Sequence, residues 1–124
     1  MKQVLATDQA PAAIGPYSQG IAAGETVYVS GQLPLDPATG AFPEGIAAQT
    51  AQSLKNIQAI LAQQDMTLAN VVKTTVFLAD INDFAEMNKV YGEFFTQPYP
   101  ARSAVQVAKL PKDAPLEIEC IAVK

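Results

Sequence analysis

The side chain with the most specific chemistry in this sequence is its only arginine, Arg102, which follows Pro100 and Ala101. A guanidinium group binds a carboxylate through two parallel hydrogen bonds, a geometry that a lysine ammonium cannot reproduce. A lysine would also condense with a carbonyl compound, so arginine is the better group for binding an oxo acid. The alternative is a surface salt bridge, and position and rarity favour the two interpretations equally.

Two acidic residues, Glu117 and Glu119, alternate with apolar residues in the run from Leu116 to Val123. In a strand, this alternation places both carboxylates on one face, together with Ile121. Partial burial on such a face raises the pKa of a carboxylate, as a general acid or base near neutral pH requires. The alternative is a pair of solvent-facing acids on an edge strand, and the pattern alone favours that alternative.

Four further residues are candidates for lining a site. Tyr17 lies in a loop rich in glycine and proline, where an aromatic side chain either lines a site or packs against the core. Ser30 and Gly31 end a predicted strand, where a hydroxyl and a backbone N–H can face a ligand or simply terminate the strand. Asn88 lies on an apolar helix face, where the pattern favours a satisfied core amide over a ligand contact.

Absent residue types narrow the chemistry further. With no histidine and a single cysteine, the chain has neither a Ser-His-Asp arrangement nor a ligand set for structural zinc. No Walker sequence and no strand-coupled GxGxxG motif offers a phosphate cradle. We therefore expect carboxylate, hydroxyl, backbone and guanidinium groups to perform the chemistry, with no metal and no cofactor.

Charge and hydropathy argue against nucleic-acid and membrane partners. The formal net charge is -4, and the lysines are scattered singly, so no basic run is available to neutralise phosphates. No apolar run approaches the roughly 20 residues of a membrane helix, and the first residues lack the apolar core of a signal peptide. We expect a cytoplasmic protein.

The elements that must position these residues follow from hydrophobic periodicity, and 124 residues fit a single domain, 1–124. Gly24 and Glu25 form a predicted hairpin turn, and Asp83 is a predicted N-cap for the second helix. The predicted elements are strands at 19–23 and 26–30, a helix at 46–64, a strand at 71–79, a helix from 84, and strands at 103–108 and 116–123. Residues 3–5 are a candidate for one more short strand.

This β-β-α-β-α-β-β order predicts an α+β fold with both helices on one face of a mixed sheet. The strand at 71–79 carries apolar residues on both faces, with Val72, Val76 and Leu78 on one and Val71 and Phe77 on the other. Only 16% of residues are charged, against roughly 25% in an average domain. Since no helix remains for the second face, we expect neighbouring subunits to cover it.

Several short motifs, taken in order, resemble those of the RidA (YjgF) family of enamine/imine deaminases, and the resemblance covers almost the whole chain. They are Gly15-Pro16-Tyr17-Ser18-Gln19, Val29-Ser30-Gly31-Gln32, Asn82-Asp83-Phe84 with Asn88, Pro100-Ala101-Arg102-Ser103 and Leu116-Glu117-Ile118-Glu119. The resemblance implies a chorismate-mutase-like fold and a homotrimer with sites in the clefts between subunits.

The same resemblance implies roles for individual residues. Arg102 would bind the substrate carboxylate with help from the Gly31 N–H, and Glu117 would position or activate the attacking water. Tyr17, Ser30 and Asn88 match positions that line or support the pocket. Ala104 stands where many relatives have cysteine, and its backbone carbonyl would help to hold the water.

The implied reaction is hydrolysis of 2-iminobutanoate or 2-iminopropanoate, formed by pyridoxal-phosphate dehydratases, to 2-oxo acids and ammonia. Two alternatives stay open. One is a trimer that binds small carboxylates without catalysis and serves regulation. The other is a ribonuclease or translation inhibitor, which the acidic charge disfavours.

Overall fold

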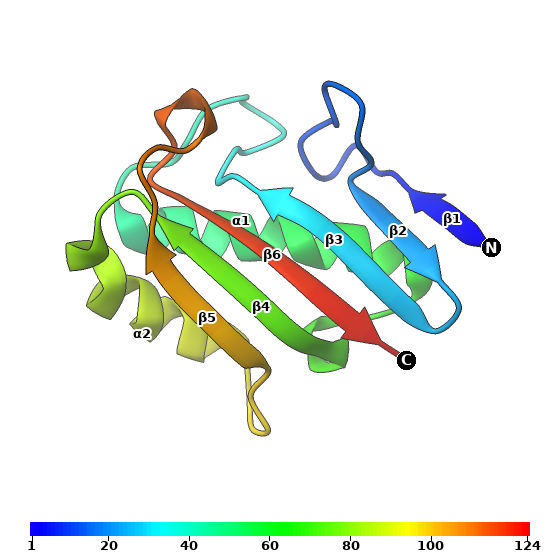
Figure 1. The fold of residues 1–124 in the computed structure, drawn as a ribbon. Coiled ribbons are helices and arrows are strands. Elements are labelled where there is room, and N and C mark those ends of the chain that lie inside the picture. Colours follow the sequence, from blue (N-terminus) through cyan, green and yellow to red (C-terminus); the bar gives the residue numbers. More distant parts are fainter.

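A mixed six-stranded sheet forms one layer of the computed structural model, which describes residues 1–124, and two α-helices form the other (Figure 1). The elements are β1 (Lys2–Leu5), β2 (Gly20–Ala23), β3 (Thr26–Gln32), α1 (Ile46–Leu61), β4 (Val71–Leu78), α2 (Phe84–Phe94), β5 (Ala101–Gln106) and β6 (Leu116–Val123). The order in space is β1-β2-β3-β6-β4-β5, and only the β4–β5 pair is parallel. The predicted α+β fold is confirmed, and the candidate strand near the N-terminus is present as β1.

Local patterns located most element boundaries. The predicted hairpin joins β2 to β3 through Gly24, whose φ of 61° is a left-handed angle that glycine adopts without strain. The first helix is shorter than predicted, because residues Ala62–Gln64 form a 3-10 turn. Asp83 precedes α2 as predicted, but its side chain makes no capping hydrogen bond. Asp80 instead accepts a hydrogen bond from the Asn82 backbone N–H in the preceding turn.

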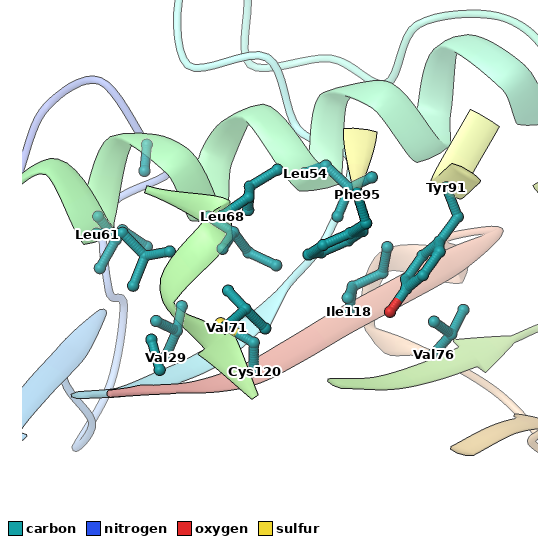
Figure 2. Packing of buried hydrophobic residues seen from close by; sticks show 14 of the residues in the cluster. Val29, Leu54, Leu61, Leu68, Val71, Val76, Tyr91, Phe95, Ile118 and Cys120 are labelled. Atoms are coloured by element: carbon teal, nitrogen blue, oxygen red, sulfur yellow. The ribbon is translucent and has the colours of Figure 1, made fainter. Parts of the chain in front are cut away.

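The core lies between α1 and the sheet, where apolar side chains interdigitate (Figure 2). The predicted face of the first helix is confirmed, since Ile46, Thr50, Leu54, Ile57, Ile60 and Leu61 are all buried. Burial of each large aliphatic side chain contributes about 1.5–3 kcal/mol. This packing fixes α1 against β3 and β6, the two strands that carry Ser30, Gly31 and Glu117.

A bulge in β4 changes the predicted facing of its side chains. The register of β4 against β6 shifts between Val71 and Lys73, so one extra residue is accommodated there. Val71 is therefore buried together with Val76 on the helix side, whereas Val72 is 48% exposed. The prediction that Val72 shares a face with Val76 is wrong, because simple alternation ignores the extra residue.

The sheet face opposite the helices has no covering layer within the chain (Figure 1). Cross-strand partners place a row of apolar side chains on this open face: Val4, Ile21, Tyr28 and Ile121. In a second row on the same face, Phe77 has Glu117 and Val105 as its two cross-strand partners. Covering of this face by neighbouring subunits stays a prediction. None of the helices is long and apolar enough to span a membrane.

Candidate active site

The residues predicted to form the site fall into two groups on opposite faces of the sheet. Arg102 on β5 is paired with Thr74, which is fully buried beneath α2, so its side chain lies on the helix face. Glu117 on β6 is paired with Phe77 on the open face. Asn88 and Ala104 belong with Arg102, whereas Tyr17, Ser30 and Gly31 belong with Glu117. One chain therefore does not bring Arg102 to Glu117.

The Glu117 group lines a cleft of about 990 Å³ at one end of the sheet. Its walls come from the loops after β1 and β3 and from the loop before β6, and these loops gather at the same end of the molecule (Figure 1). A hollow of about 490 Å³ adjoins it on the open face. Tyr17, Ser30 and Glu119 line both spaces.

Ser30 and Gly31 form a bulge within β3 and do not end the strand as predicted, since β3 continues to Gln32. The bulge brings the Gly31 backbone against the Glu117 carboxyl group. A Cβ atom at position 31 would lie 2.6 Å from Glu117 Cδ and 2.8 Å from its Oε2. Any side chain at this position would therefore displace the carboxylate, so glycine is required here for close approach.

Partial burial raises the pKa of Glu117, and the nearby carboxylate of Glu119 raises it further. Both side chains line the cleft, although Glu119 is exposed. A carboxylate with a raised pKa takes up a proton more readily, which suits proton exchange with a bound water. The alternative of two fully solvated acids is thus wrong for Glu117.

The Arg102 group is held together by direct contacts. Arg102 Nη1 donates a hydrogen bond of 2.7 Å to Asn88 Oδ1, so the exposed Asn88 is not the core amide that the helical pattern favoured. The guanidinium carbon lies 4.7 Å from the centroid of the Tyr91 ring and 5.5 Å from that of Phe84. No carboxylate of the chain forms an ion pair with Arg102. Its fork is therefore available to an external acid.

Comparisons with known proteins identify the family of this chain. Residues 7–124 match the family described as endoribonuclease L-PSP. A 2-iminobutanoate/2-iminopropanoate deaminase of Salmonella typhimurium is 52% identical, and the alignment covers 100% of this chain and 99% of that protein. The chain belongs to the YjgF/RidA family.

Solved structures of YjgF/RidA proteins share the fold. RidA from an Antarctic Psychrobacter species has a TM-score of 0.95 at 49% identity, and the match covers 98% of this chain and 99% of that chain. TdcF of Escherichia coli, solved with bound serine, has a TM-score of 0.94 at 47% identity, with 98% of both chains covered.

Two buried amides shape the cleft of this YjgF/RidA protein, and neither was predicted to have a role. Gln19 exchanges two hydrogen bonds with the backbone of Thr7, at 2.7 and 3.0 Å, and so holds the loop after β1. Asn56 on α1 donates to the carbonyls of Leu33 and Leu35, at 3.1 and 2.9 Å, and so holds the loop after β3. The signal for Asn56, which was not used in the prediction, was an amide beside the apolar face of α1.

Ala104 follows Arg102 on the same face of β5. It pairs with Val76 and packs partly buried against the core. A methyl group suffices for that packing. The side chain at position 104 therefore supports the strand that carries Arg102.

Proposed function

We propose that this protein hydrolyses 2-imino acids, such as 2-iminobutanoate and 2-iminopropanoate, to 2-oxo acids and ammonia. The observation that carries the proposal is the Arg102 fork, which is fixed by Asn88 and two aromatic rings and has no carboxylate partner within the chain. Such a fork suits a substrate carboxylate. The deaminase name of the Salmonella typhimurium relative supports the choice of imino acids.

The catalytic site in this proposal is formed between subunits of a homotrimer. Arg102 lies on edge strand β5, whereas Glu117 lines a cleft on the other face of the sheet. If the β5 edge of one subunit approaches the cleft of the next, both groups face one space. The same contact would cover apolar side chains such as Tyr28 and Val105, which are 51% and 43% exposed.

The reaction then needs only side chains, backbone groups and water. Arg102 binds the carboxylate with help from the Gly31 N–H and places the imine carbon beside a water held by Glu117 and the Ala104 carbonyl. Glu117 accepts a proton as the water oxygen bonds to the carbon, and it passes this proton to the imine nitrogen. Transfer of the hydroxyl proton of the resulting carbinolamine to its nitrogen then accompanies C–N cleavage, which releases ammonia and leaves the 2-oxo acid. Tyr17, Ser30 and Asn88 shape or support the pocket.

A coupled assay tests this function. A threonine dehydratase generates 2-iminobutanoate in solution, and the appearance of 2-oxobutanoate is followed with and without the protein. We expect the protein to accelerate this appearance and Arg102→Ala to abolish the effect. A regulatory protein that binds small carboxylates without catalysis would bind 2-oxobutanoate but leave the rate unchanged.

Mixed oligomers test the intersubunit site. Arg102→Ala and Glu117→Gln variants should each be inactive, but equal amounts refolded together should regain about one quarter of wild-type activity. A site that takes Arg102 from one subunit and Glu117 from its neighbour is intact at about this frequency when subunits mix at random. The measurement is the coupled assay on the refolded mixture.

Each variant refolded alone is the control for that experiment. Absence of any recovery, with mixed oligomers demonstrated by a tag on one variant, would show that both residues act within one chain. Sedimentation of the wild-type protein as a monomer at micromolar concentration would also contradict the intersubunit site.

Binding or cleavage of RNA is the less favoured function, despite the endoribonuclease description of the family. The formal net charge is -4, and the only cation beside the Glu117 carboxylate in the cleft is Lys112. Acidic groups repel phosphates. RNA cleavage that depends on Arg102 and is independent of the purity of the preparation would revive this function.

We place the protein in the cytoplasm.

A further inference from the structure

We propose that Tyr91 is a positioning residue for Arg102, because its ring supports the guanidinium group while its hydroxyl fixes the ring to the sheet. This inference rests on the proposed function for its consequence in catalysis, but the positioning can be measured without catalysis. The Tyr91 ring centroid lies 4.7 Å from the Arg102 guanidinium carbon. Tyr91 Oη and Thr74 Oγ1 form a buried hydrogen bond of 2.7 Å.

The position of Thr74 explains how one side chain makes both contacts. Thr74 on β4 is the cross-strand partner of Arg102 on β5, so the two side chains lie next to each other on the helix face. Tyr91 descends from α2 onto this pair, with its hydroxyl end directed at the sheet (Figure 2). Its ring also packs against that of Phe95, whose centroid lies 4.5 Å away with an angle of 33° between the ring planes.

The buried hydroxyl pair anchors the far end of the Tyr91 ring, and packing against Phe95 restricts rotation of the ring plane. Tyr91 is 4% exposed and Thr74 is fully buried, so neither hydroxyl has water as an alternative partner. Moving the Tyr91 hydroxyl away from Thr74 would leave two polar groups without hydrogen bonds, which is costly in the interior. Burial also raises the pKa of Tyr91, so the hydroxyl keeps its proton.

A fixed ring in turn restricts the arginine. A free arginine side chain populates many rotamers, and binding a carboxylate would have to restrict them. Stacking on Tyr91 and the hydrogen bond from Nη1 to Asn88 Oδ1 hold the plane of the guanidinium before substrate arrives. Tyr91 therefore acts through Arg102, without a place among the groups that touch substrate.

Arg102 offers a direct spectroscopic measurement, because it is the only arginine in the sequence. Its Nε–H group gives one arginine side-chain signal in a ¹H–¹⁵N spectrum, and protons above an aromatic ring face are shifted upfield. Tyr91→Phe keeps the ring, whereas Tyr91→Leu removes it. Leu61→Ala is the control, because it removes a fully buried side chain of α1 that lies away from Tyr91 (Figure 2).

We expect Tyr91→Leu to move the Arg102 Nε–H signal to the position of a solvated arginine and to weaken binding of 2-oxobutanoate about tenfold. KM for 2-iminobutanoate should rise by a similar factor. Tyr91→Phe should retain the upfield shift and stay within about threefold of wild-type binding. Thermal unfolding of each variant measures the structural cost separately.

The inference is overturned if Tyr91→Leu leaves the Nε–H signal and the affinity unchanged, or if Leu61→Ala alters both equally. In the second case Tyr91 would serve only the core. If the wild-type protein shows no deaminase activity, the proposed function fails. The Nε–H signal and the 2-oxobutanoate titration still decide the role of Tyr91 in that event.

Discussion

Arg102→Lys is expected to lower kcat/KM for 2-iminobutanoate by about 100-fold or more, although the positive charge is retained. A lysine ammonium lacks the planar fork, so it cannot donate to Asn88 and hold both carboxylate oxygens in the same geometry. A misplacement of about 1 Å at the reacting carbon is enough for a loss of this size. Initial rates in the coupled dehydratase assay measure the effect.

Lys109→Ala is the control for the loss of a cation elsewhere on the molecule. Lys109 pairs with Asp113 at 3.2 Å, but the two side chains are 75% and 80% exposed, so the pair contributes little. We expect this variant to retain wild-type rates within about twofold. Turnover of Arg102→Lys close to wild type would refute the carboxylate clamp.

The features that the sequence predicted are those that depend on neighbours along the chain. The hairpin at Gly24 and the buried face of α1 follow from local turn geometry and from helical periodicity. The bulge beside Val72 could not be predicted, because it arises from the pairing of β4 with β6, far apart in the sequence. Strand alternation predicts which residues share a face of the sheet only where the pairing between strands contains no bulge.

The placement of Arg102 and Glu117 on opposite faces of the sheet could not be predicted for a similar reason. Alternation shows which residues of one strand share a face, but only the pairing between strands shows that Arg102 and Glu117 lie on opposite faces. The helical pattern favoured a core amide at Asn88, and it was wrong for a related reason. Helix α2 lies over the edge of the sheet, so part of its inner face meets Arg102 instead of the core. Periodicity does not reveal what lies opposite a helix face.

Glu117→Gln should lower kcat for 2-iminobutanoate by about 100-fold or more, because the amide cannot accept the proton of the attacking water. Binding of 2-oxobutanoate should stay within about threefold of wild type, since Arg102 provides the carboxylate contact. Single-turnover rates and calorimetric titration separate the two effects. Equal losses of catalysis and binding would make Glu117 a structural residue of the cleft.

The pH dependence of the reaction distinguishes a proton acceptor from a passive polar group. Burial and Glu119 raise the pKa of Glu117, so the wild-type rate should fall as the pH is lowered through that raised value. Glu119→Gln removes one of these causes and should move the acid limb to lower pH, while Glu117→Gln should lack the limb. An acid limb that is unchanged in both variants would belong to another group.

Protein stability provides a second measure of the protonation of Glu117. Folding favours the protonated carboxyl group, whereas the proposed reaction needs the ionised one. A raised pKa means that the folded protein binds the Glu117 proton more tightly than the unfolded chain does. The wild type therefore loses stability as the pH rises from the ordinary value of 4.5 through the raised one, and Glu117→Gln lacks this loss. Unfolding experiments at several pH values should find Glu117→Gln at least as stable as the wild type at neutral pH. The bulge at Gly31 thus packs against the carboxylate that we propose as the proton acceptor, and the ionised form of this carboxylate lowers the stability of the fold.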